Sequence, residues 1–334
     1  MLLSGWYCSQ QELGLNHTNK MESENQTSVT EFIILGLSSH RGTQLWLFAL
    51  FLGMYVITLV GNTVIIVTIR IDPRLDTPMY FFLGNLSFLD ICYTSSVVPQ
   101  MLVHFLAQHK AISFSSCTAQ LYVSLSLGSI EFILLAVMAY DRYVAICNPL
   151  HYTVTMSKRV CIQLAVASWA SGFLNSLVQT TFTMRLPFRG FNIINHFACE
   201  AVALIKIACS NTYVNEIILV MASVLILIIP CSFIILSYIY IISSILRIRS
   251  SEGRYKTFST CISHITVVML CYGTAIFAYM RPRASVSPNQ DKMFSLFYAV
   301  VTPMLNPVIY SLRNKEVKEA LAKAMGSGLS SEKR

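Results

Sequence analysis

The amino-acid sequence predicts an all-α membrane protein, a bundle of seven transmembrane helices followed by a short amphipathic C-terminal helix. Of the 334 residues, 54% are hydrophobic and only 12% are charged. Soluble domains carry about 25% charged residues, which they need to cover their surface. Apolar stretches of about 20 residues, long enough to cross the hydrocarbon of a bilayer as helices, occur seven times. Strand-type alternation of apolar and polar residues is absent, which disfavours a membrane barrel.

These seven stretches are the predicted helices. Asp90 and Glu131 are the only acids within them, in the second and third, and His264 in the sixth is the only basic side chain. Their bounds are residues 45–69, 79–103, 117–140, 160–184, 217–246, 257–280 and 293–312. The predicted organisation is an extracellular tail at 1–44, a seven-helix domain at 45–312, and a cytoplasmic interfacial helix and tail at 313–334.

The distribution of basic residues predicts the orientation. With the N-terminus outside, the inner segments hold fifteen Lys and Arg residues and the outer segments hold nine. Basic residues favour the cytoplasmic side, so we expect a multi-pass protein with its C-terminus in the cytoplasm. The net charge of +8 then lies mostly on a rim that faces anionic lipid and cytosolic partners, and no nucleic-acid partner is needed to explain it.

The N-terminal tail carries glycosylation signals. Asn16 and Asn25 each begin an Asn-X-Thr tripeptide in polar sequence. Asn85 also matches the pattern but falls inside the second predicted helix. The first residues lack the basic start and long apolar stretch of a signal peptide, and we expect residues 1–20 to be an optional extension.

Most of the ten cysteines fall in predicted helices and are interpreted as small apolar residues. Cys117, Cys199 and Cys209 lie on the predicted outer side, which is oxidising. A disulfide between Cys117 and Cys199 would hold the long segment before the fifth helix across the end of the third.

Five motifs in order resemble the odorant receptors, the large tetrapod class within the rhodopsin-like G-protein-coupled receptors. They are PMYFFLGNLSFLD (78–90), MAYDRYVAICNPLHY (138–152), SYIYI (237–241), KTFSTCISHI (256–265) and PMLNPVIYSLRN (303–314). The resemblance implies a plasma-membrane receptor and not an enzyme. It implies a small, mostly neutral, hydrophobic volatile ligand and a stimulatory G protein of the olfactory type that raises cAMP.

The resemblance also assigns residues to activation. Arg142, at the inner end of the third helix, is expected to be held by Asp141 at rest and then released to the G protein; the alternative is a pair that only anchors the helix at the interface. Pro307 is a candidate hinge or a tolerated kink. The full set is Asp141, Arg142, Tyr143, Tyr238, Asn306, Pro307 and Tyr310.

Asp90 and Glu131 are expected near the same depth, close to the bilayer middle. Each would cost about 2.5–3.5 kcal/mol if it faced lipid, so both should turn inward, with Asn62 and Asn306 as amide partners. Two interpretations stay open: a polar network that joins helices, or a site for a sodium ion, the one candidate cofactor.

The ligand is expected in the outer half of the bundle, although ordinary helix packing explains any one of the positions equally well. The predicted ligand-binding residues are Ser124, Leu125, Gly128, Ser129, Ile226, Tyr272, Ile276 and Tyr279. No acid or base occurs among them, which argues against an amine ligand. The stretch His196–Glu200 is similar to a proposed metal-binding pattern of the family, but one histidine and one glutamate make a poor site.

The chain departs from the family pattern at Arg189, which stands where the family has the first of three cysteines in the second outer loop. Cys209 would then lack its usual partner, so we expect it to be a free thiol. Val317, Leu321 and Ala324 follow helical spacing and predict an interfacial helix on the inner leaflet.

The rival hypothesis is a transporter or channel with a proton path through Asp90 and Glu131, which the absence of an internal repeat disfavours. No phosphate loop, metal-spaced cluster or nucleophile triad indicates catalysis.

Overall fold

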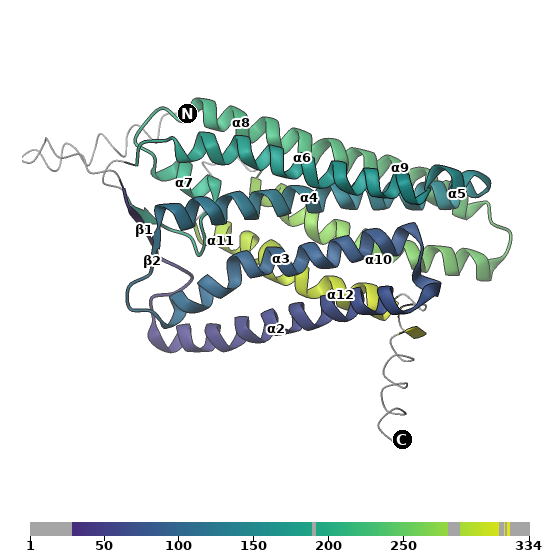
Figure 1. Ribbon diagram of the computed structural model, residues 1–334, viewed down its shortest axis with the longest axis horizontal. Helices are drawn as coiled ribbons and strands as arrows, with labels where there is room; N and C mark the ends of the chain where they lie inside the picture. Colours follow the sequence, from purple (N-terminus) through teal and green to yellow (C-terminus); the bar gives the residue numbers. More distant parts are fainter. Residues whose placement is uncertain (1–28, 189–191, 280–287, 314–316, 318, 321–334) are drawn as a thin grey trace, which may run out of the picture.

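The computed structural model describes residues 29–188, 192–279, 288–313, 317, 319 and 320. The long helices lie side by side along one axis (Figure 1). In chain order they and the helical turns between them are α2 (Arg41–Ile71), η1 (Pro73–Leu75), α3 (Pro78–Leu106), α4 (Phe114–Cys147), η2 (Pro149–His151), α5 (Tyr152–Thr155), α6 (Lys158–Met184), α7 (Ala201–Ile207), α8 (Tyr213–Ser223), η3 (Val224–Ile228), α9 (Ile229–Leu246), α10 (Ser251–Tyr279), α11 (Pro288–Leu296), η5 (Phe297–Val301) and α12 (Thr302–Arg313).

Seven helical spans within the described residues are long and apolar enough to cross a membrane, which confirms the predicted bundle. Two of them are built from three elements each, α8 with η3 and α9, and α11 with η5 and α12. The helix ends differ from the sequence-based bounds: α4 runs on to Cys147, so that Asp141 and Arg142 lie within the helix rather than at its end.

Apolar side chains cover the outward faces of the bundle. Val220, Ile229 and Ile235 are each more than half exposed. A soluble protein would not leave such a surface to water, so lipid is its natural solvent.

A small sheet at one end of the bundle was not predicted. Strand β1 (Glu31–Ile34) pairs antiparallel with β2 (Ala111–Ser113) and parallel with β3 (Ile193–Ile194). Gly36, with a φ of +73°, turns the chain after β1 in a conformation that glycine adopts without strain. We call this end of the bundle the sheet end and the opposite end, near α5, the Arg142 end (Figure 1).

The sheet has its own apolar cluster, in which Phe32, Ile112 and Leu121 are buried around the Cys117–Cys199 disulfide. Lys110, in the loop before β2, donates a hydrogen bond to the Ser38 carbonyl at 3.2 Å. Partial burial, and then the nearby guanidinium of Arg41, lowers the pKa of Lys110. The N-terminal strand is therefore held on the bundle by backbone pairing and packing, and the partly buried Lys110 amine holds the segment that follows it.

Two helical turns of the wide π type interrupt the fifth and seventh spans. Turn η3 is followed by Pro230, and η5 by Pro303. Proline lacks the N–H that would close an ordinary α-helical turn, and single π turns are frequent at functional sites. Both turns carry residues of the cavity described below.

Several predictions fall outside the described residues. The glycosylation sites Asn16 and Asn25, the extension at 1–20, and Arg189 belong to this group. The interfacial helix after residue 313 lies mostly outside them too, although Val317 and Ala320 are described and buried. It stays a prediction.

Helices α4 and α6 approach each other closely at Gly172. A Cβ atom on Gly172 would lie 2.8 Å from the Ser126 carbonyl oxygen and 3.1 Å from the Ile130 nitrogen, so the backbones meet where the side chain is missing. One turn further along, Ser176 Oγ donates to the Tyr122 carbonyl at 2.6 Å. In a membrane the hydrophobic effect does not drive helices together, because lipid tails are as apolar as the side chains. Small residues stabilise the helix pair instead, because they let the two backbones pack closely.

Substituting Gly172→Ala is expected to lower the stability of the protein by about 1–3 kcal/mol, because the added methyl group must push two backbones apart. The measurement is the melting temperature of detergent-purified protein. Gly273→Ala is the matched control, since a Cβ there meets no atom within 4 Å. Equal melting temperatures for the two variants would contradict the prediction.

Candidate functional site

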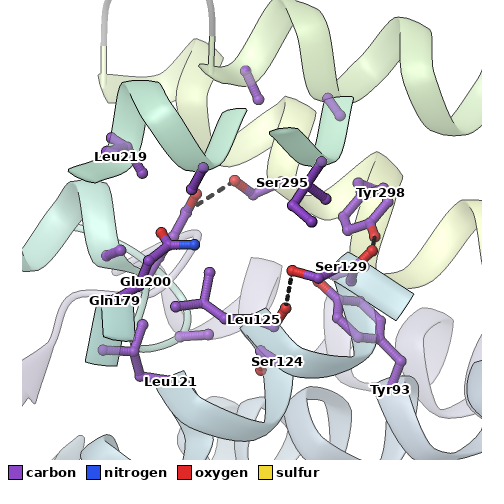
Figure 2. Close-up of a pocket in the computed structure, with 18 of the residues that line it drawn as sticks. Tyr93, Leu121, Ser124, Leu125, Ser129, Gln179, Glu200, Leu219, Ser295 and Tyr298 are labelled. Carbon is purple, nitrogen blue, oxygen red and sulfur yellow. Dashed lines mark hydrogen bonds between the residues drawn. The ribbon is translucent and has the colours of Figure 1, made fainter. Parts of the chain in front are cut away.

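A cavity of about 110 Å³ lies in the half of the bundle nearer the sheet end. Helices α3, α4, α6, α8 and α10 surround it together with η3, η5 and the segment that follows β3 (Figure 2). Five predicted ligand-binding residues line it: Ser124, Leu125, Gly128, Ser129 and Ile226.

The three predicted residues of α10 are placed differently. Tyr272 lies beneath the cavity, where its hydroxyl donates to the Phe132 carbonyl at 2.8 Å. Ile276 packs against the core and is not among the lining residues. The side chain of Tyr279 lies outside the described part. Helix α10 contributes Ala275 and Ala278 to the lining instead.

Polar groups of the lining are mostly engaged with the protein itself. Ser129 Oγ donates to the Leu125 carbonyl at 2.7 Å and accepts from Asn175 Nδ2 at 2.9 Å. Gln179, on α6, lines the cavity beside them (Figure 2). A ligand therefore meets a few polar groups, of which Ser129 and Asn175 already bond within the protein, set in an apolar wall.

An acid and a base reach the cavity from the segment between β3 and α7, which sequence reasoning did not place there. Glu200 Oε2 accepts a hydrogen bond from Ser295 Oγ at 3.0 Å (Figure 2). His196 Nε2 lies 2.8 Å from the same oxygen, close enough for a charge pair but outside hydrogen-bond geometry. The described residues bring together no group of three or more side chains suited to a metal.

The floor of the cavity is aromatic. The rings of Phe132 and Tyr298 stack with centroids 5.6 Å apart, and Tyr93 meets Tyr298 edge-on at 5.5 Å. Tyr272 packs edge-on against Phe132 from below at 4.9 Å. The hydroxyl of Tyr298 donates to Glu131 Oε2 at 2.9 Å, so the floor joins the cavity to the buried acids.

Asp90 and Glu131 are both fully buried, as predicted. The two acids do not share a partner: Asp90 bonds to Asn306, and Glu131 bonds to Cys271 and Tyr298. Asn306 Nδ2 donates to Asp90 Oδ2 at 3.0 Å, and Asn62 Nδ2 donates to the Pro303 carbonyl at 3.2 Å. The Oδ1 atoms of Asn62, Asp90 and Asn306 are buried and lack a hydrogen-bond partner within the described chain. Oxygen donors of this kind suit a hard cation such as sodium. Glu131 fits this role less well, because Cys271 and Tyr298 already donate to its two oxygens.

The disulfide joins Cys117 to Cys199, as expected. The Cys199 N–H donates to Gln120 Oε1 at 2.9 Å, which fixes the bridged segment above α4. The Cys209 N–H donates to the Pro187 carbonyl at 3.1 Å, and the redox state of its sulfur stays a prediction.

At the Arg142 end, the structure differs from the expected pairing. Asp141 Oδ1 accepts from the Tyr152 hydroxyl at 2.8 Å, and no ion pair within 4.0 Å joins Asp141 to Arg142 in the described chain. Burial, and then the Asp141 carboxylate, raises the pKa of Tyr152, which keeps this donor protonated. Arg142 instead borders a small pocket with Thr260 and Tyr310.

Tyr238 is also engaged elsewhere. Its hydroxyl lies 2.8 Å from His264 Nδ1, while His264 Nε2 lies 3.1 Å from the Leu135 carbonyl. A carbonyl oxygen only accepts, so Nε2 carries the proton and ties α10 to α4.

The buried Tyr310 hydroxyl has no hydrogen-bond partner among the described residues. Tyr143 packs edge-on against Tyr240 at 6.1 Å. Asn306 bonds to Asp90, as described above. Pro307 lies within α12, and its ring is close to Gly61 of α2, where an added Cβ atom would lie 3.0 Å from it.

Comparison with known proteins decides the family. Residues 51–327 match the family model described as olfactory receptor. The chain belongs to the olfactory receptor family. It is 56% identical to Olfactory receptor 2F1 of Homo sapiens, over 93% of this chain and 99% of the relative. Identity to the Olfactory receptor-like protein OLF3 of Canis lupus familiaris is also 56%, over 92% and 96%. Olfactory receptor 13D1 of Homo sapiens is 52% identical, over 97% and 93%.

Membership makes the chain a multi-pass G-protein-coupled receptor and not an enzyme. It also decides against the rival transporter hypothesis. For this olfactory receptor, the lined cavity is the candidate odorant site and the Arg142 end is the candidate G-protein site.

A bulky residue in the wall of the cavity is expected to weaken odorant responses. Ala222→Phe, on α8, would fill space next to Ile226, and a response found in the native receptor should need at least about tenfold more odorant. Val220→Phe is the control, because Val220 lies on the same helix and is 61% exposed to the outside of the bundle. The measurement is the odorant concentration for half-maximal cAMP at matched surface expression; unchanged potency in Ala222→Phe would contradict the site.

Proposed function

We propose that this olfactory receptor binds small, mostly neutral, hydrophobic volatile molecules in the cavity above Phe132 and Tyr298. The observation that carries the proposal is the lining, in which apolar side chains predominate and the polar side chains of Ser129 and Asn175 are already hydrogen-bonded within the protein. Among the described residues, Glu200 is the one carboxylate of the lining; it already accepts a hydrogen bond from Ser295 and lies beside His196. A neutral molecule enters such a cavity without leaving a buried charge unpaired.

The cytoplasmic partner in this proposal is a stimulatory G protein of the olfactory type, which raises cAMP. Arg142 is only 8% exposed, and α10 is tied to α4 through His264 on the same half of the bundle. Opening of α10 would expose Arg142 and free Tyr238 from His264. Asn306 and Pro307 provide a hinge in α12 for the same motion.

The proposed location is the plasma membrane, with the sheet end outside. The disulfide lies at the sheet end, and disulfides persist in oxidising compartments. The excess of Lys and Arg falls in the segments at the other end, which agrees with a cytoplasmic Arg142 end. Sugar chains on Asn16 and Asn25 would then face the exterior.

Cells that express the receptor with the olfactory G protein are expected to raise cAMP for at least one member of a panel of volatile alcohols, aldehydes, ketones and esters. Arg142→Ala should abolish that response at equal surface expression, because the side chain that meets the G protein is lost. Arg159→Ala, an exposed arginine at the same end, is the control and should respond as the native chain does. A response that persists in Arg142→Ala, or a ligand-dependent current without any G protein, would contradict the proposal.

A further inference from the structure

Glu131 joins three parts of the bundle through a single carboxyl group. It lies on α4 and is fully buried. Its Oε1 accepts from the Cys271 thiol of α10 at 3.1 Å, and its Oε2 accepts from the Tyr298 hydroxyl of η5 at 2.9 Å. Both oxygens are therefore engaged by donors on other helices, one on each side.

Tyr298 has a second role, because its side chain also lines the cavity (Figure 2). The hydroxyl reaches Glu131 past Gly128, where a Cβ atom would lie 3.0 Å from it. The ring lies flat against Phe132, with 8° between the ring planes, and η5 supplies its backbone. A molecule in the cavity can thus touch the ring whose hydroxyl holds the acid.

We propose that Tyr298, Glu131 and Cys271 form a clamp that holds α10 against α4 in the empty receptor, and that a ligand seated on the Tyr298 ring releases it. Tyr298 is a positioning residue in this mechanism, since it acts on α10 through Glu131. The proposal rests on the proposed odorant function and adds the residues that report occupancy of the cavity.

The physical basis is the cost of an unsatisfied buried acceptor. When the ligand turns the Tyr298 ring, Oε2 of the fully buried Glu131 loses its donor, and the carboxyl must find another partner. Hydrogen bonds that share one carboxyl change together, so the Cys271 bond is lost or redirected. The ligand shifts the equilibrium only because it contacts the released arrangement better than the clamped one.

The test compares variants in cells without odorant. Tyr298→Phe keeps the ring and removes the hydroxyl, so basal cAMP at equal surface expression should rise about three- to tenfold, the population change for one lost hydrogen bond. Cys271→Ala should give a similar rise, and Cys271→Ser, which keeps a donor, should stay near the native level. The double variant Tyr298→Phe with Cys271→Ala should rise no further than either single variant, because the two act on one clamp.

Tyr55→Phe is the matched control, since it removes a tyrosine hydroxyl bonded to Ser95 between α2 and α3, away from Glu131. A misfolded receptor loses signalling, so a rise in basal cAMP separates the clamp from a purely structural role. In a receptor whose cAMP does rise with an odorant, native basal cAMP in Tyr298→Phe, or a rise in Cys271→Ser equal to that in Cys271→Ala, would overturn the proposal.

A second measurement needs no G protein. The rate at which a small methanethiosulfonate modifies Cys271 in purified receptor, with Cys271→Ala as the blank, should rise several-fold in Tyr298→Phe. If this rate rises while cAMP never responds, the clamp stands and the proposed coupling fails. If the rate is unchanged, the clamp itself is refuted.

Discussion

Three hydrogen bonds tie α10 to α4 within little more than one turn of α4. Cys271 bonds to the Glu131 side chain, Tyr272 to the Phe132 carbonyl and His264 to the Leu135 carbonyl. In a bilayer these bonds have no water to compete with them, and apolar packing distinguishes poorly between a protein neighbour and lipid. The position of α10, and with it access to Arg142, depends on this seam.

The seam connects the two functional ends of the receptor. Its upper part is the floor of the cavity, because Phe132 lines the cavity and Tyr272 packs beneath it. Its lower part is His264, which also holds Tyr238 of α9. Arg142 follows Glu131 by eleven residues, about 16 Å along the helix. A change at the cavity floor therefore needs to cross only a few helical turns to reach the Arg142 end, the proposed G-protein site.

The spans and the buried acids could be predicted because they depend on local composition, and the disulfide because Cys117 and Cys199 fall on the predicted outer side. An apolar run of 20 residues has few alternatives to a membrane helix, and an acid within it must face inward. The sheet could not be predicted in this way: β1, β2 and β3 have four, three and two residues, too few for a period-2 pattern. The position of Glu200 at the cavity could not be predicted either, because Glu200 lies on a loop whose path depends on that sheet and on the disulfide.

The hydrogen-bond partners of individual polar side chains could not be predicted from the sequence either. Asp141 pairs with Tyr152 across a chain reversal rather than with its neighbour Arg142, since adjacent residues on a helix do not face each other. Cys271 was interpreted as a small apolar residue, which its burial confirms, yet its thiol is a donor to Glu131. The wide turns η3 and η5 precede prolines, and this is a signal in the sequence that could have located part of the cavity wall.

The central claim is that α10 is held on α4 in the empty receptor and leaves it when an odorant binds. The most direct measurement is the distance between spin labels at Val154, after α4, and Tyr255, on α10, both of which are largely exposed at the Arg142 end. Double electron–electron resonance with an odorant that raises cAMP should show a longer distance than the empty receptor. An unchanged distance distribution, with cAMP still raised by the same labelled receptor, would contradict the account.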